Sequence, residues 1–312
     1  MIEDLAPIEL RLSVAQLKSR SSDITFGLKI AIYGIVIYYG ATLATSPYLF
    51  AQVIGTMALG LMFAHGVELQ HQVLHNQGIN NRLTNEIVGI FLGIPMLVSY
   101  AGYQASHLRH HRDLGTPANK EFFDYGDQYG QKKASIFLWT YRLLMPSLYL
   151  SFIKNLWLTL WVRKFKDEQQ SVSQRMCRDY LLMLLSISIL AIYSYVTHSL
   201  VIIHIWLIPL IFVAGPVHAL IELPEHFACN TQSKNVYDNT RTIKSNAFLT
   251  WFTNCNNYHV EHHLMPGLPI DRLHDVHAVI HSQIQHYYPT YRSFYRSLFR
   301  NSLTTRTSGD LK

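Results

Sequence analysis

Hydrophobic positions along the chain are concentrated in two long runs without Asp, Glu, Lys or Arg, at residues 30–64 and 180–221. A membrane-spanning helix needs about 20 apolar residues, so each run is long enough for two such helices. Each run also has a polar break near its middle, TSP at residues 45–47 and THS at residues 197–199. The pattern therefore predicts four membrane-spanning helices in two hairpins, at about residues 28–45, 47–66, 180–197 and 200–221.

The charged residues give this arrangement an orientation. All 26 Lys and Arg residues lie outside the two uncharged runs, so the hairpin tips have none. Since loops rich in Lys and Arg stay on the cytosolic side, we expect both termini and the segment between the hairpins to be cytosolic. Residues 1–25 are then a cytosolic segment, residues 26–300 a single membrane domain, and the polar residues 301–312 a disordered tail.

The composition agrees with a membrane protein. Apolar residues make up 49% of the chain and charged residues 15%, whereas charged residues make up about 25% of an ordinary soluble domain. The net charge of +6 is modest, and we expect lipid and protein partners rather than nucleic acid. The three cysteines form no C-x-x-C pair, which indicates reduced thiols rather than disulfides or a zinc knuckle.

Histidine is the second unusual feature of the chain. Eight of the 17 histidines fall in three short clusters: HQVLH at residues 71–75, HLRHH at residues 107–111 and HVEHH at residues 259–263. Side chains three and four residues apart share one face of a helix, so the imidazoles of each cluster can converge. Each cluster alone also fits a polar helix face or a basic surface at the membrane. Three clusters on one side of the membrane are difficult to explain in that way.

Imidazole groups in this number indicate two metal ions. Imidazole suits Zn, Cu, Fe and Ni, and because a structural zinc takes four ligands, eight or nine imidazoles are too many for one metal. The clusters must meet on one side of the membrane, so we expect the apolar stretches 87–103 and 134–162 to be in-plane or cap helices at the cytosolic surface. The predicted fold is an all-α integral membrane protein with four spans and a cytosolic helical cap that holds the histidines.

The order of these features resembles the membrane fatty acid desaturase and hydroxylase superfamily. An H-x-x-x-H cluster is followed by two H-x-x-H-H clusters, with the second hairpin between them. The resemblance extends from residue 45 to residue 285 and includes NNRLTNEIVG, SHLRHHRDLGTP and NYHVEHHLMPGLPIDRLHDVH. It implies a non-heme di-iron site whose ligands include His71, His75, His107, His110, His111, His259, His262 and His263.

Members of this superfamily usually have one more histidine shortly before the third cluster. The segment ELPEHF supplies His226 for this role, and His218 in GPVHAL is the second choice. One departure is Gln72, because family members often have Glu beside the first histidine, and this leaves the partner of His71 open. The residues that we expect to support the ligands are Glu68, Glu222, Glu261 and Asn257.

The resemblance implies an oxygen-dependent enzyme. Two Fe ions would use O₂ and electrons to remove hydrogen from an acyl chain that is linked to a lipid, to acyl carrier protein or to CoA. The sequence has no H-P-G-G heme segment and no Gly-rich nucleotide loop, so we expect electrons from a separate ferredoxin or b-type cytochrome. The 13 Lys and Arg residues between residues 65 and 178 offer a surface to this acidic partner or to anionic lipid headgroups.

Three functions remain open at this point. The first is an acyl desaturase, which forms a double bond. The second keeps the same di-iron site and forms a hydroxyl group, a keto group on a carotenoid, or a triple bond. The third is a non-catalytic metal transporter or sensor, but transporters hold their ligands near the middle of the membrane, whereas these clusters lie outside the predicted spans. The sequence favours the desaturase.

Overall fold

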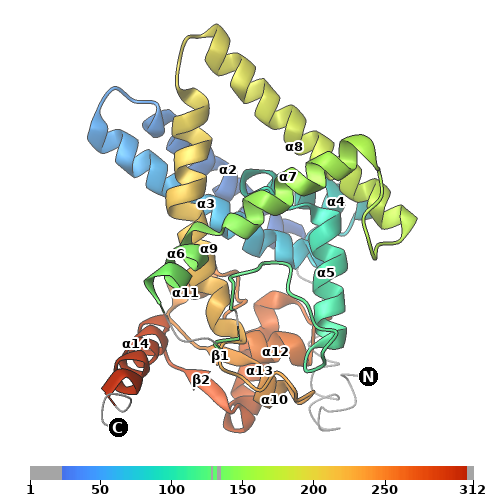
Figure 1. The fold of residues 1–312 in the computed structure, drawn as a ribbon, viewed down its shortest axis with the longest axis vertical. Coiled ribbons are helices and arrows are strands. Elements are labelled where there is room, and N and C mark those ends of the chain that lie inside the picture. The colour runs from blue at the N-terminus through green and yellow to red at the C-terminus, as the bar shows by residue number, and fades with distance from the viewer. Residues whose placement is uncertain (1–22, 128, 132–134, 308–312) are drawn as a thin grey trace.

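Helices make up most of the chain in the computed structural model, which describes residues 23–127, 129–131 and 135–307 (Figure 1). Four helices are long and apolar enough to cross a membrane. They are α2 (Asp23–Ala44), α3 (Leu49–Leu74), α8 (Gln170–Val196) and a fourth, interrupted helix over residues 203–225. The all-α integral membrane fold predicted from the sequence is confirmed. The predicted segment 1–25 lies almost wholly outside the described residues.

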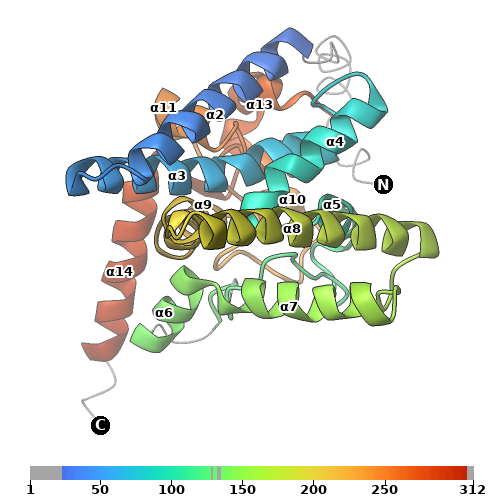
Figure 2. The same cartoon turned by 90° about the horizontal axis from the view of Figure 1, so that it is seen from above.

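The first hairpin pairs α2 and α3 side by side (Figure 2). Small residues make this close approach possible, as is common between membrane helices. A side chain at Gly55 of α3 would collide with the backbone of α2 at Ala44, and one at Gly60 would collide with Val213 of the fourth helix. Helix α3 continues to Leu74, eight residues beyond the predicted end of the second span at residue 66, and so extends into the cap.

The fourth helix is irregular along its length. It consists of the π-helical segments η3 (Ile203–Leu207) and η4 (Pro209–Ala214), then α9 (Gly215–Glu222) and the short 3₁₀ turn η5 (Leu223–Glu225). Its prolines lack the N–H that an α-helix would use, and wider or tighter turns accommodate the missing hydrogen bonds. The helix ends directly before His226.

The two stretches expected to be in-plane or cap helices form bent helix pairs. Helix α4 (Arg82–Gly93) and the turn η2 (Ile94–Met96) meet α5 (Tyr100–Asp113) at an angle of 96°. Helices α6 (Ile136–Leu144) and α7 (Pro146–Trp161) meet at 46°. Both pairs have the composition of a broken span, so the described residues contain four membrane helices, or up to six if each bent pair is one span. The in-plane arrangement stays a prediction.

The cap lies below the spans in the view of Figure 1 and is built from short elements. Helix α12 (His259–Leu264) packs on α13 (Leu273–Ile280) through a buried core of Val260, Leu264, Leu273, Val276 and Ile280. A small parallel sheet joins β1 (Arg241–Ile243) to β2 (His286–Tyr288). The other cap elements are α10 (Val236–Asn239), α11 (Ala247–Phe252), η6 (Ile270–Arg272), η7 (His281–Gln283) and α14 (Tyr291–Thr307).

Part of the predicted disordered tail, residues 301–312, is helical. Helix α14 runs through Thr307, because extending an existing helix costs far less free energy than starting one. Residues 308–312 lie outside the described residues.

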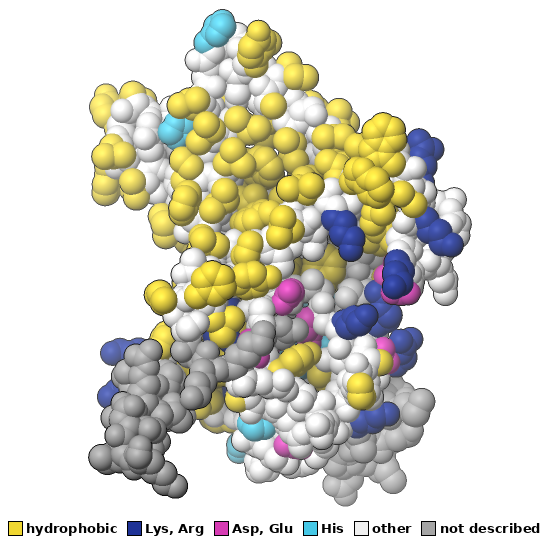
Figure 3. All heavy atoms as spheres, viewed as in Figure 1, with side chains coloured by type: hydrophobic (Ala, Val, Ile, Leu, Met, Phe, Trp, Pro, Cys, Tyr) yellow, Lys and Arg dark blue, Asp and Glu magenta, His cyan; other side chains and the backbone are white. Residues whose placement is uncertain are grey.

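On the surface, apolar side chains cover the upper part of the molecule around the spans, and Lys and Arg side chains gather below them on one side (Figure 3).

Asp179 of α8 holds the start of α5, the helix that carries the second histidine cluster. Its Oδ2 accepts hydrogen bonds from the Ser99 hydroxyl and from the Ala101 N–H, both at 2.9 Å. Ser99 in turn caps α5 by accepting from the N–H of Gly102 at 3.1 Å. Asp179 is completely buried and also pairs with Arg178 at 2.9 Å. Helix α5 is therefore fixed to the second hairpin at its first turn.

We predict that Asp179→Ala lowers the free energy of unfolding by about 2 kcal/mol, because two buried donors lose their acceptor. Reversible denaturant unfolding of the detergent-solubilised protein measures this. The control is Asp275→Ala, whose side chain pairs with Arg272 at the surface and whose loss costs under about 1 kcal/mol. Equal losses in the two variants would contradict the anchoring role of Asp179.

Candidate metal centre

Three helices and one turn bring the predicted ligands together. The extension of α3 carries His71, and His75 is its C-terminal cap. The last two turns of α5 carry the second cluster, and α12 consists almost entirely of the third cluster. His226 follows η5 at the end of the fourth helix. All nine predicted ligands fall into two separate groups within the cap, and the fold thus joins positions that lie far apart in the chain.

The first group, the five-histidine group, contains residues from all three clusters. Its Nε2 atoms face one another: the distance is 2.8 Å from His71 to His107, 2.9 Å from His107 to His111, and 3.0 Å from His111 to His262. His75 completes the group, and its buried Nε2 has no hydrogen-bond partner among the described residues.

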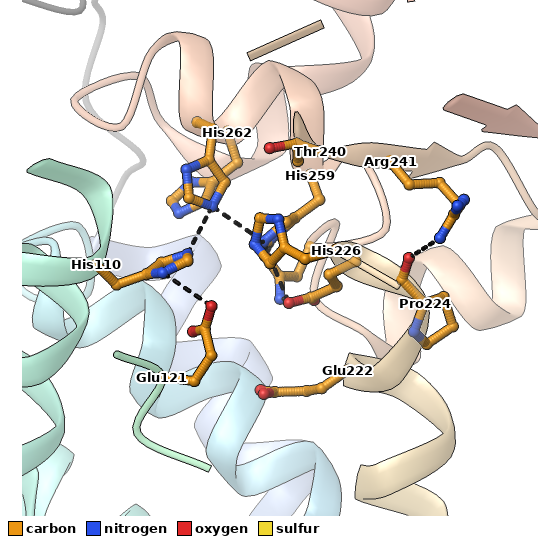
Figure 4. A network of polar contacts seen from close by, with 12 residues as sticks. His110, Glu121, Glu222, Pro224, His226, Thr240, Arg241, His259 and His262 are labelled. Atoms are coloured by element: carbon orange, nitrogen blue, oxygen red, sulfur yellow. Dashed lines mark hydrogen bonds and ion pairs between the residues drawn. The ribbon is translucent and has the colours of Figure 1, made fainter. Parts of the chain in front are cut away.

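The second group, the four-histidine group, has the same construction. The Nε2 distances are 3.2 Å from His110 to His263, 3.1 Å from His263 to His259, and 3.3 Å from His259 to His226. All four residues are buried. Figure 4 shows the rings of His110, His226 and His259 turned toward a common region.

The hydrogen bonds on the outer ring atoms show what the inner atoms can do. His226 donates from Nδ1 to the carbonyl oxygen of Asn239 at 3.0 Å, and His259 donates from Nδ1 to Oδ1 of Asn256 at 3.1 Å. The Asn256 amide is held in this orientation because its Nδ2 donates to Glu225 at 2.8 Å. A neutral imidazole has a proton on only one ring nitrogen, so the Nε2 atoms of His226 and His259 carry lone pairs that face each other.

A metal ion fits this arrangement. Two facing lone pairs repel each other in a buried site, and a cation between them reverses the sign of the interaction. Metal–nitrogen bonds are about 2.1 Å, so two nitrogens at right angles on one metal are about 3 Å apart, close to the observed spacings. Burial lowers the pKa of His226 to about 4 and the pKa of His259 well below its usual value. These rings are therefore neutral at neutral pH and can act as ligands.

Residues 47–295 match the fatty acid desaturase family. The chain belongs to this family. It is also 30% identical over 253 residues to the dihydrorhizobitoxine desaturase of Bradyrhizobium elkanii, an alignment that covers 75% of this chain and 68% of the relative. The family resemblance noted in the sequence is confirmed, and with it a desaturase- or hydroxylase-type oxidoreductase. The desaturase family generally uses two iron ions, for which the two histidine groups are the candidate sites.

The second choice for the ninth ligand, His218, lies apart from both histidine groups of this family member. It forms a third group with Glu68 and Glu222, two of the residues expected to support the ligands, and His218 and Glu68 are buried there. Its Nδ1 contacts the hydroxyl of Tyr125 at 3.0 Å. Both carboxylate oxygens of Glu68 are buried without a hydrogen-bond partner among the described residues. The structure thus brings His226, not His218, to the other histidines.

The other two expected supporting residues act on the scaffold. Glu261 points away from the histidine groups, accepts from the Thr242 hydroxyl at 2.6 Å and pairs with His277. Asn257 donates from Nδ2 to the carbonyl oxygens of Ile243 and Lys244 at 2.8 and 2.9 Å. Both residues thereby fasten α12 to its neighbours: Glu261 to β1 and α13, and Asn257 to the end of β1.

Sequence reasoning missed several residues that touch the histidines. His110 Nδ1 lies 2.9 Å from both Asn119 Oδ1 and Glu121 Oε1. Burial opposes ionisation of Glu121, yet the adjacent His110 lowers the pKa of that carboxyl to about 2. Asn119 and Glu121 lie in a loop without periodicity, so no pattern in the sequence marks them. Asn256, three residues before His259, could have been found from its helical spacing.

The partner of His71 remains open in the structure. Its buried Nδ1 has no hydrogen-bond partner among the described residues. Gln72, which replaces the usual Glu, donates instead to the carbonyl oxygen of Gln77 at 2.8 Å and accepts from Asn254 at 3.0 Å. Its role is to tie the end of α3 to the loops that follow.

A small cavity of about 20 Å³ lies between the two histidine groups. His107 belongs to the five-histidine group and His110 and His259 to the four-histidine group, and all three line this cavity. A volume of this size holds about one water molecule. The remaining lining residues are Tyr103, Glu121, Phe122, Phe123, Glu222, Glu225 and Asn256.

We predict that the purified wild-type protein binds two metal ions per chain. His107→Ala, in the five-histidine group, and His263→Ala, in the four-histidine group, should each lower this number to about one, because every ligand position of a site contributes to metal affinity. Elemental analysis after gel filtration measures this number.

The control is His198→Asn, at the tip of the second hairpin, where the backbone has φ 48°. Asn tolerates this conformation, so this variant should retain both ions. Two ions in either of the alanine variants would remove that histidine from the ligand set.

Proposed function

We propose that this chain is an O₂-dependent di-iron desaturase that introduces a double bond into an acyl chain. One observation carries the proposal: five and four imidazoles, all buried except His75, form two adjacent groups in which neighbouring inner nitrogens are 2.8 to 3.3 Å apart. The family match supports the same chemistry. The proposed iron ligands are His71, His75, His107, His111 and His262 in one group and His110, His226, His259 and His263 in the other.

The proposed reaction balances as one –CH₂–CH₂– unit, O₂, two electrons and two protons giving one –CH=CH– unit and two water molecules. When bound, the two iron ions supply the redox chemistry that activates O₂ and breaks C–H bonds. The residues of the chain hold the ligand rings in their orientation, as Asn256 does for His259. They also keep the surroundings of the small cavity buried, which restricts water at the reacting carbon.

A second cavity supports an acyl substrate. Its volume is about 130 Å³, and it lies between the start of α7, α8 and the loop before α6. It shares Phe122 and Phe123 with the small cavity beside the histidines, so these two rings separate the two spaces. Leu97, Met145, Leu148 and Phe152 are among its other walls. We infer that part of the acyl chain occupies this space, with the reacting carbons near the rings.

The distribution of charge supports a cytosolic location for both termini and for the metal centre. No Lys or Arg occurs in either hairpin tip, and positive loops remain on the cytosolic side. Arg163, Lys164 and Lys166 are exposed in the loop between α7 and α8. Such residues suit contact with lipid headgroups or with an acidic electron carrier. We propose that a separate ferredoxin or b-type cytochrome supplies the electrons.

A second candidate keeps the desaturation and changes the substrate. The relative in Bradyrhizobium elkanii is named for dihydrorhizobitoxine rather than for a fatty acid. A substrate other than a fatty acyl chain is therefore the strongest alternative. Hydroxylation, ketone formation and triple-bond formation at the same site are further outcomes that the following experiment separates.

We predict that cells expressing this chain together with a ferredoxin and its reductase accumulate acyl chains lighter by two hydrogens, with the double bond at one position. Mass spectrometry of lipids, acyl carriers and polar metabolites measures the product. The matched control is His263→Ala, which should abolish the product while the protein stays in the membrane. A hydroxylated product without an alkene would contradict desaturation, and an unsaturated polar metabolite would favour the second candidate. Metal binding without any product would favour a transporter or sensor.

A further inference from the structure

One histidine group contains five imidazoles and the other contains four, and a carboxylate lies beside the group of four. Oε2 of Glu225 lies 3.1 Å from Nε2 of His259, the inner nitrogen of that ring. This distance equals the 3.1 Å that separates the Nε2 atoms of His259 and His263. The geometry points to Glu225 as a fifth ligand of the metal in the four-histidine group. This inference rests on the proposed function, in which a metal ion occupies that group.

A metal ligand and a residue that only supports a ligand differ in which nitrogen of the histidine ring they contact. A carboxylate that only orients a metal-bound histidine contacts the ring nitrogen opposite the metal. Glu121 does so, because it contacts Nδ1 of His110, whose Nε2 faces the group. Glu225 does the opposite, because it contacts His259 on the Nε2 side. Its oxygen therefore lies among the inner nitrogens rather than behind them.

Asn256 fixes both partners at once. Its Oδ1 accepts the Nδ1 proton of His259 at 3.1 Å, and its Nδ2 donates to Oε1 of Glu225 at 2.8 Å. The neutral His259 ring therefore has no proton left on Nε2. Nε2 of His259 and, in the carboxylate form of Glu225, its Oε2 can then only accept a hydrogen bond, and they are held 3.1 Å apart. A cation bound to both atoms removes this conflict.

The backbone before His226 keeps Glu225 in place. Glu225 and His226 are consecutive residues at the end of the fourth helix. The buried guanidinium of Arg241, from β1, donates to the carbonyl oxygen of Pro224, the residue before Glu225 (Figure 4). The end of this helix therefore contributes two adjacent ligands, one imidazole and one carboxylate, to the same metal.

A carboxylate at this position makes the two metal sites chemically unequal. Five neutral imidazoles leave the full charge on a divalent ion, whereas four imidazoles and Glu225 lower the net charge of the second site by one. Mixed histidine and carboxylate ligation is typical of non-heme iron sites, while imidazole alone also suits copper and zinc. Glu225 therefore favours iron in the four-histidine group and gives each site five protein ligands.

The test is a Co²⁺ titration of the full-length, metal-free protein in detergent, followed by visible absorption and by the bound metal per chain. The wild type should bind two Co²⁺ ions. Glu225→Gln keeps a group that can hydrogen-bond to His259 but loses the charge. It should lower the affinity for one of the two Co²⁺ ions at least about 10-fold and change the absorption spectrum of that ion. Glu225→Asp, which keeps the charge, should weaken that ion less.

The matched control is Glu86→Gln, because the exposed fraction of its side chain is similar, 18% against 15% for Glu225, but it pairs with Arg175 and Arg178 rather than with a histidine. It should bind both ions with the wild-type spectrum. The unaffected ion in the five-histidine group reports that the Glu225→Gln variant is folded. Two ions bound by Glu225→Gln with unchanged affinity and spectrum would overturn the role of Glu225 alone. Failure of the wild type to bind a second ion would instead overturn the di-metal proposal.

Discussion

Nine imidazole rings, all buried except His75, turn toward one another in two groups, and contacts within the cap hold them there. The Nε2 atoms of neighbouring rings are 2.8 to 3.3 Å apart. Where two of them carry lone pairs, as in His226 and His259, the contact is unfavourable in a buried site unless a cation lies between them. Asn239 and Asn256 accept hydrogen bonds from the Nδ1–H groups of His226 and His259, so the inner Nε2 atoms of these two neutral rings carry no proton. Under the proposed function, metal ions bound in the two groups would contribute their binding free energy to the folding of the cap.

The membrane helices serve this arrangement by placing the ligands at defined heights and angles. Helix α3 continues into the cap as one rigid element and carries His71 to its place. The second cluster needs a helix in another direction, and the 96° bend before α5 provides it, held by Asp179 from the second hairpin. The third cluster is a helix of only six residues, and Glu261 and Asn257 fasten it to its neighbours. Packing in the spans and polar contacts in the cap therefore act together.

Periodicity and spacing could predict much of this structure. The uncharged runs predicted four membrane helices, spacing marked the eight histidines of the three clusters, and the family resemblance added His226; the fold brings these nine residues into two groups. The features that the sequence did not predict are the bend at Leu97, the π-helical turns of the fourth helix and the helical residues 301–307. These features depend on tertiary packing or on the extension of a helix. Glu121 and Glu225 were also not predicted. They lie in a loop and a turn, where no sequence pattern shows that the fold will place a carboxylate beside a histidine ring.

Anomalous X-ray diffraction at the iron edge, from crystals of the iron-loaded protein, tests the central claim most directly. The account predicts two anomalous peaks per chain: one within bonding distance of Nε2 of His71, His75, His107, His111 and His262, and one within bonding distance of Nε2 of His110, His226, His259 and His263. A single peak, or peaks outside these two groups, would contradict the account.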